Sequence, residues 1–213
     1  MKWLLSALLI FFCITSCASH NPIPTTALTR GTEAEKKKVS ENGIDLVISP
    51  ILSEAVMEAY FDQDLLKYDI LPVQVAVLNN SAAPLRLTQE ALCLTNTANE
   101  PCPRLSVDEV VRRLKKSYWR SVGWGAALGL MGAIPSAINV SMTNEKMAFY
   151  YKTRELKTEV LSVGACTEGV VFFDIPKDTE VLDGWALELR FHTPTHPAPR
   201  VLTYALAGDL SRK

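Results

Sequence analysis

The chain has 213 residues, of which 22 are Lys or Arg and 23 are Asp or Glu, so its formal net charge is −1 at pH 7. This length is sufficient for one domain with a hydrophobic core of its own. The near-zero charge excludes the general basic excess of proteins that bind nucleic acid through its phosphates, and we expect no nucleic-acid partner.

The first 17 residues have the organisation of an export signal. Lys2 supplies a positive charge, an apolar run covers residues 4–14, and small residues lead to Cys17. A basic start, about 7–15 apolar residues and a cut site after small residues are typical of a secretory signal. The run is too short to cross about 30 Å of hydrocarbon as a mature helix.

The sequence Ile14-Thr15-Ser16-Cys17 resembles the lipobox of bacterial lipoproteins. That resemblance implies cleavage before Cys17, diacylation of its sulfur, for example with palmitate, and acylation of the new amino terminus. Several acyl chains anchor a protein stably, whereas one does so only marginally. In such lipoproteins Asp after the Cys often causes retention in the inner membrane, and here Ala18 follows. The resemblance therefore favours a lipid-anchored protein of the outer membrane that faces the periplasm; an ordinary signal peptide with an incidental Cys is the alternative.

Residues 17–38 are expected to form the acylated Cys and a flexible tether. They contain a Pro-rich part, 21–26, and a charged part, 33–38, without an apolar period. Fully extended, some 20 residues reach roughly 70 Å, so the folded part can stand off the membrane surface. We expect residues 1–16 to be the signal peptide and residues 39–213 to form the folded domain.

The folded part is predicted to be mainly β. β-branched, aromatic and alternating apolar residues predict strands over 44–49, 70–78, 85–95, 169–175, 185–191 and 201–207, with a short helix over 53–60. Pro72 indicates an edge strand or the start of a strand. Six or so short strands separated by turn signals predict a β-sandwich, and the arrangement resembles an immunoglobulin-like sandwich at the level of fold only.

Three cysteines follow the lipobox: Cys93, Cys102 and Cys166. Turn-forming Asn and Pro residues lie between the first two, so a disulfide between Cys93 and Cys102 could close a hairpin. The periplasm permits such a bond. A Cys102–Cys166 bond or three free thiols are the alternatives. Neither a CxxC motif nor a Cys/His spacing indicates a zinc site.

A helical insertion is expected at about 106–161. Ser106 and Glu109 fit a capping box, and apolar residues follow at helical spacing, so a helix is predicted to begin at Ser106. A second helix is predicted over about 142–161. Basic residues gather in and after the first helix: Arg112, Arg113, Lys115, Lys116 and Arg120.

Between these helices lies an uncharged segment, 121–144, in which small residues recur every four positions. It contains a GxxxG pattern at Gly125 and Gly129, as in closely packed membrane helices. Pro135 is expected to bend or break a helix there. The segment could pack on the sheet, bind a protein partner or a second copy, or contact lipid, for which basic and Trp residues suit the interface. The candidate interaction or membrane residues are Arg112, Arg113, Lys115, Lys116, Trp119, Arg120, Trp124, Gly125, Gly129 and Ala133.

Catalytic motifs are missing from the sequence, which has no GxSxG, HExxH or Walker loop. Asp62 and Asp64 lack the Gly and Glu of a calcium loop. We therefore expect no enzymatic activity, no cofactor and no metal. The leading hypothesis is a non-catalytic envelope lipoprotein whose insertion mediates protein association or lipid contact. The alternative is a periplasmic carrier of an apolar small molecule or lipid.

Overall fold

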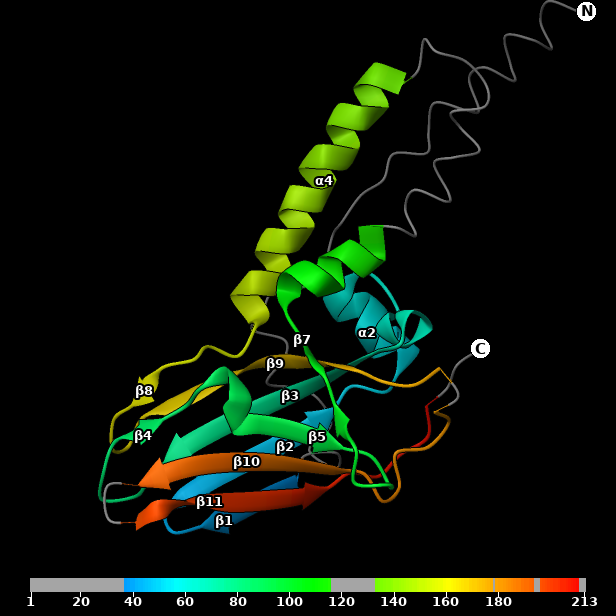
Figure 1. Ribbon diagram of the computed structural model, residues 1–213. Helices are drawn as coiled ribbons and strands as arrows, with labels where there is room; N and C mark the ends of the chain where they lie inside the picture. The colour runs from blue at the N-terminus through cyan, green and yellow to red at the C-terminus, as the bar shows by residue number, and fades with distance from the viewer. Residues whose placement is uncertain (1–36, 116–132, 178, 194–195, 211–213) are drawn as a thin grey trace, which may run out of the picture.

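The computed structural model describes residues 37–115, 133–177, 179–193 and 196–210 (Figure 1). This part of the chain is mainly β, as predicted, and its strands form three antiparallel sheets. Two residues assigned above to the tether, Lys37 and Lys38, belong to the first strand instead. They pair with β2 through a tight turn at Asn42 and Gly43, both of which have positive φ.

The largest sheet has five strands in the order β1 (Lys37–Glu41), β2 (Ile44–Pro50), β3 (Ile70–Asn79), β9 (Cys166–Asp174) and β7 (Arg104–Leu105). The central strand β3 pairs with β9 along its length, from Ile70 opposite Asp174 to Leu78 opposite Cys166. Alternate side chains of β3 point inward, and those of Val73, Val75 and Val77 are fully buried.

The second sheet has the order β11 (His196–Ala205), β10 (Ala186–Thr193), β5 (Leu92–Thr95) and β6 (Pro101–Cys102). A small third sheet pairs β4 (Leu85–Arg86) with β8 (Val160–Leu161). Strands β6 and β7 are separated only by Pro103, so the chain passes directly from the second sheet into the first. At the other border β1 lies beside β11, where Arg200 approaches Glu41 to 3.9 Å.

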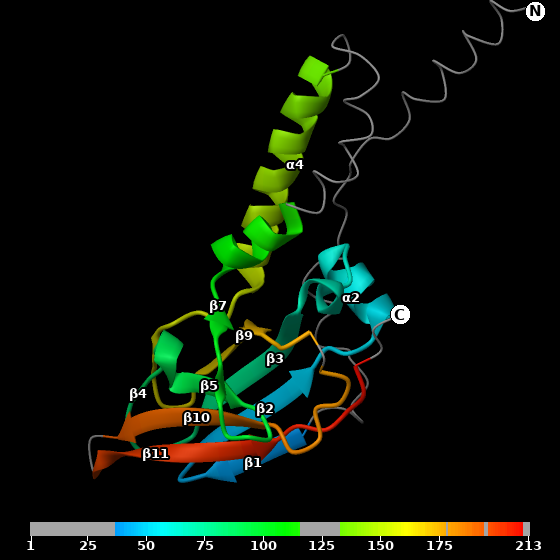
Figure 2. The same cartoon turned by 45° about the vertical axis from the view of Figure 1, so that its right-hand side comes forward.

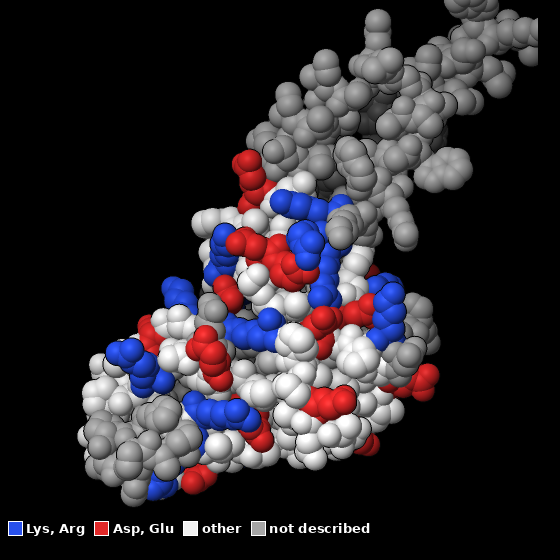
Figure 3. Space-filling model, viewed as in Figure 1, with Lys and Arg blue, Asp and Glu red and all other residues white. Residues whose placement is uncertain are grey.

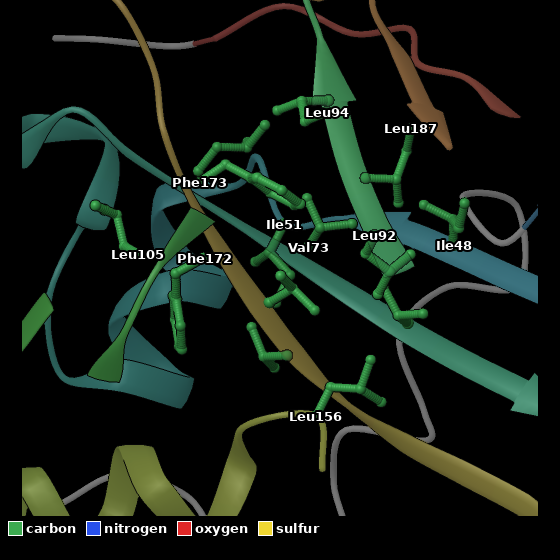
Figure 4. Close-up of a cluster of buried hydrophobic side chains, with 14 of the residues drawn as sticks. Ile48, Ile51, Val73, Leu92, Leu94, Leu105, Leu156, Phe172, Phe173 and Leu187 are labelled. Carbon is green, nitrogen blue, oxygen red and sulfur yellow. The ribbon is translucent and has the colours of Figure 1, made fainter. Parts of the chain in front are cut away.

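The core lies between the two larger sheets. Figure 4 shows Ile48, Val73 and Phe173 of the first sheet pointing toward Leu92, Leu94 and Leu187 of the second. Each of these side chains is at most 3% exposed. Burial of an apolar side chain contributes about 1.5–3 kcal/mol, so this shared layer holds the two sheets together. The helical elements around the sheets are α2 (Glu54–Phe61), η4 (Leu65–Tyr68), η5 (Gln89–Ala91), the helix of residues 107–115 and α4 (Ala133–Arg154).

Five of the six predicted strands are present as β2, β3, β9, β10 and β11. Strand β11 begins earlier than predicted, since the chain turns back at once after β10 and Thr193 pairs with His196. Pro72 lies near the start of β3, which confirms the second of the two alternatives given for it; the edge-strand alternative is wrong because β3 is central.

The sixth prediction, a single strand over 85–95, is wrong. The segment contains β4, then η5, then β5, and the two strands belong to different sheets. The buried positions explain the break, because they change phase from Leu85 and Leu87 to Leu92 and Leu94. A continuous strand keeps one alternation, so the short helix between the two strands takes up the shift.

A buried amide joins two turns at one end of the first sheet. Asn79 is fully buried, and its Nδ2 donates to Ala83 O at 2.9 Å and to Leu161 O at 3.0 Å. Its Oδ1 accepts from the Ser81 backbone N–H at 3.1 Å and from Ser81 Oγ at 2.6 Å. The Asn79 backbone also accepts from Gly164 N at 2.6 Å. This one side chain therefore fixes the turn after β3 against the turn before β9.

We expect Asn79→Ala to lower the free energy of unfolding by about 2–3 kcal/mol, because it leaves buried carbonyl and N–H groups without their partners. Urea denaturation measures the loss. The matched control is Asn80→Ala, which removes an exposed amide that donates to Asp45 at 3.2 Å. The control should stay within about 0.5 kcal/mol of the parent chain, and equal losses would contradict the role given to Asn79.

Candidate functional site: the helical arm

Two helices inserted between β7 and β8 form a projection that we call the helical arm, comprising described residues 106–115 and 133–156. Figures 1 and 2 show α4 standing away from the sheets, with the helix of residues 107–115 beside its lower half and above α2. Helix α4 has 22 residues. At about 1.5 Å per residue, its length is about 33 Å.

The first helix of the arm begins where the sequence predicted. Ser106 Oγ accepts a hydrogen bond from the Glu109 backbone N–H at 3.2 Å, which is the capping interaction. The apolar face of this helix is buried through Val107, Val110, Val111 and Leu114. The Glu109 carboxylate accepts from Arg112 Nε at 2.8 Å and from Arg113 Nε at 3.3 Å.

An ion pair attaches this helix to the end of β9. Arg113 donates from Nη1 and Nη2 to the two carboxylate oxygens of Asp174, at 2.6 and 2.9 Å. This bidentate hydrogen bonding to the guanidinium holds the pKa of the Asp174 carboxyl below its usual value, and the pKa of Arg113 is raised in turn. Arg113 therefore helps to seat the arm on the sheet.

The lower part of α4 is held by an aromatic cluster. Met147, Tyr151 and Arg154 follow at spacings of four and three and are at most 2% exposed, so they form the inward face of the helix. The Tyr151 ring stacks on Phe61 of α2 at 5.4 Å between centroids and lies 5.7 Å from Phe172 of β9. The helix thus packs against both α2 and the sheet.

A buried cation completes this base. The Arg154 guanidinium carbon lies 4.0 Å from the centroid of the Tyr150 ring and 5.5 Å from that of Tyr60. Burial lowers the pKa of Arg154 to about 10, so it remains protonated at neutral pH. Cation–π attraction is stronger where the cation is shielded from water, so Arg154 ties α4 to α2.

The chain leaves α4 by crossing β9 at very short range. Glu155 bridges to Val170, and Leu156 N donates to Val170 O at 3.0 Å. A Cβ at position 169 would lie 2.5 Å from Leu156 Cα, so only glycine fits there. The bounds predicted for the second helix, 142–161, are therefore wrong at both ends. Helix α4 ends at Arg154 because the next residues bond to β9. At its other end α4 includes Pro135, which lies in the first turn of the helix as described, where proline is tolerated.

The arm joins the sheets at two places, the start of its first helix and the C-terminal end of α4, which we call its roots. Side chains also tie these two roots to each other. Lys152 of α4 lies 3.1 Å from Asp108 of the first helix. Arg104, in β7, lies 3.5 Å from Glu155 at the end of α4. Both roots are thus fixed within the span of residues 169–174 of β9 and to one another.

The predicted interaction residues fall into two groups. Arg112, Arg113 and Lys115 lie in the described helix, where Arg112 is 62% exposed and Arg113 is engaged by Asp174. Ala133 is the first residue of α4. The others lie outside the described residues, and these are Lys116, Trp119, Arg120, Trp124, Gly125 and Gly129; the predicted lipidation residue, Cys17, lies outside them too.

The predicted Cys93–Cys102 disulfide is not formed, and Cys93, Cys102 and Cys166 are free thiols. The register of the β5–β6 pair gives the reason, because Leu94, not Cys93, lies opposite Cys102. Adjacent residues of a strand point to opposite faces, so the two thiols are on opposite sides of the sheet. Burial raises the pKa of the Cys102 thiol to about 11, which keeps it protonated at neutral pH.

Two surface hollows lie near the exit of α4. One is lined by Lys152, Glu155, Leu156, Lys157 and Thr158. The other is lined by Arg86, Leu87, Thr88, Glu90, Thr158, Glu159 and Val160. Both are open and lined mainly by charged and polar side chains. Among the described residues no group of His, Cys, Asp and Glu could hold a metal ion, and no described helix is both long and apolar enough to cross a membrane.

The sequence interpretation missed the residues that seat the arm. The signal for the inward face of α4 was present as the helical spacing of Met147, Tyr151 and Arg154. No local pattern marks Asp174 or Gly169, whose partners lie 61 and 13 positions away along the chain.

The sequence matches no protein-family model and no curated protein. Among solved structures, the chain is similar to the yjhA protein from Bacillus subtilis, with 11% identity and a TM-score of 0.38 over 72% of this chain and 78% of that one. It is also similar to a functionally unknown protein from Listeria monocytogenes EGD-e, with 10% identity and a TM-score of 0.38 over 81% of this chain and 82% of that one.

We expect Gly169→Ala to lower the free energy of unfolding by about 3 kcal/mol, because backbone atoms of Leu156 occupy the place of the new methyl group. Gly164→Ala is the control, since a Cβ there meets nothing within 4 Å although φ is +77°. The control should lose only about 1 kcal/mol, from its left-handed backbone. Urea denaturation gives both values, and hydrogen exchange of residues 147–154 should rise only in Gly169→Ala.

We expect the Arg113–Asp174 pair to stabilise the fold above about pH 4. The pKa of Asp174 is lowered on folding, so its contribution is present above the unfolded value and is lost as pH falls through the folded value. Asp174→Asn should cost about 1 kcal/mol at pH 7, a value reduced for partial exposure, and the difference from the parent should vanish in acid. Stability measured against pH tests this, with Glu168→Gln of the same strand as the control that should show no such difference.

Proposed function

We propose that the chain is a non-catalytic envelope lipoprotein, tethered by an acylated Cys17 and using its helical arm for protein association or lipid contact. The observation that carries the anchor is the lipobox-like ending of the leader at Ile14 to Cys17. The observation that carries the interaction role is the arm, whose helix α4 is about 33 Å long and stands away from the sheets above its packed lower turns.

The seating of the arm supports this role. Its two roots are attached to one strand by the Arg113–Asp174 pair and by Leu156 over Gly169. An element held at its base in this way presents its outer part at a defined place relative to the sheets. The segment between Lys115 and Ala133 contains Trp119 and Trp124 and is uncharged after Arg120, a composition that suits contact with a partner protein, a second copy or lipid.

We also propose that the folded domain, residues 39–213, is an immunoglobulin-like β-sandwich that carries the arm as its insertion at about 106–161. Two antiparallel sheets with a shared apolar core support this interpretation. We propose a site at the outer membrane, facing the periplasm, on the basis of Ala18 after Cys17. Signal peptide 1–16 and tether 17–38 complete the organisation, with β1 taking the last residues of the tether.

A carrier of an apolar molecule is the weaker candidate. Such a protein needs an enclosed, mainly apolar cavity. The two hollows near α4 are instead open, and charged side chains such as Lys152, Glu155 and Glu90 line them.

Replacing the anchoring residue tests the proposal. We expect the full-length chain expressed in a bacterium to fractionate with membranes and to carry acyl groups in its intact mass. Cys17→Ala should move the protein out of the membrane fraction, because no acyl chain can be attached. The matched control, Cys166→Ala, removes an exposed thiol of the folded part and should leave fractionation unchanged. A Cys17→Ala chain that remains with membranes to the same degree would contradict the anchor.

A further inference from the structure

We infer that the outward face of α4 around Phe149 binds an anionic lipid surface. The inference rests on the proposed function and deepens it, because it selects lipid as the partner of the arm and locates the contact. It uses the described part of α4 and does not depend on residues 116–132.

The lower turns of α4 have two different faces. Met147 and Tyr151 are 1% and 0% exposed, whereas Phe149 between them is 71% exposed. A lone exposed apolar residue is common on protein surfaces and decides nothing by itself. The residues around Phe149 are therefore what identifies its partner.

Lysines flank Phe149 on the same face. Lys146 precedes it by three positions and Lys152 follows by three, and residues at this spacing are neighbours on a helix surface. Both are exposed; the Lys152 side chain is 56% exposed even with Asp108 at 3.1 Å. Glu145 also lies on this side and offsets one charge. An aromatic ring between lysines combines the two chemistries that meet at a bilayer surface, apolar contact with the acyl boundary and attraction to headgroups.

The distribution of charge along the chain also favours an anionic partner for the arm. Described residues 106–115 and 133–161 contain seven basic and five acidic side chains, a net charge of +2, whereas the other described residues have eight basic and 15 acidic side chains, a net charge of −7. Figure 3 shows Lys and Arg side chains over the base of the arm, with Asp and Glu side chains among them. An anionic surface attracts the arm and repels the remainder, so it favours one orientation of the molecule.

Lys115 of the first helix extends this surface; Arg112 is exposed as well, although its guanidinium donates to the Glu109 carboxylate at 2.8 Å. Lys152 forms an ion pair with Asp108 of that helix, so the exposed basic residues of the two helices lie on adjacent parts of the surface. Arg113 does not contribute, since Asp174 holds it. An acidic protein could also meet this surface, and the following test separates the two partners.

The test uses the processed chain, residues 17–213, with Cys17→Ser, so that no acyl group contributes. We expect it to sediment at low salt with vesicles of phosphatidylglycerol and phosphatidylcholine in equal parts, and not with phosphatidylcholine alone. The double variant Lys146→Gln/Lys152→Gln should weaken binding about 25-fold, at about fivefold for each lysine near the surface. Phe149→Ser should weaken it at least about threefold through lost apolar contact.

Matched controls remove the same features elsewhere. Arg86→Gln/Arg190→Gln deletes two positive charges on β4 and β10, and Val201→Ser replaces an exposed apolar residue of β11. Both should bind within about twofold of the parent. Failure of the parent chain to bind anionic vesicles, as expected if an acidic protein is the partner, overturns the inference, and so does equal weakening by both double variants. Neither result bears on Cys17, whose anchor is tested by fractionation alone.

Discussion

The contact between Leu156 and Gly169 is the constraint on which the arrangement of the arm depends. It brings the backbone that leaves α4 directly onto β9, where the Leu156 N–H bonds to Val170. Because β9 is itself paired with β3 over its whole length, the arm is joined to the centre of the largest sheet. The aromatic cluster of Phe61, Tyr151 and Phe172 fills the space next to this contact.

Burial divides the basic residues of the arm by role. Arg113 and Arg154 are used inside the molecule, one against Asp174 and the other between tyrosine rings. Arg112, Lys115, Lys146 and Lys152 remain at the surface. A cluster that looks uniform in the sequence thus separates into residues that seat the arm and residues that can meet a partner. The separation depends on which side of each helix faces the sheet.

Much of the fold could be predicted from local patterns. Alternating apolar residues marked β3 and β10, and Ser106 with Glu109 marked a helix start, because these signals lie within a few residues of each other. Strands β6 and β7 have two residues each, too few for a period to appear. The end of α4 and the seat of Arg113 depend on β9, which is distant in the chain. The spacing of Cys93 and Cys102 predicted a disulfide, yet a register one residue away places the thiols on opposite faces.

The edges of the two larger sheets affect how copies of the protein meet at high concentration. One border is crossed by the chain itself at Pro103, and at the other β1 and β11 lie side by side with Arg200 near Glu41. An outer strand that lies beside another strand of the same molecule is less accessible as a template for a strand of a second copy. An open strand edge would favour stacking of copies through strand pairing. With these edges facing other parts of the same molecule, copies at high concentration can remain separate folded units.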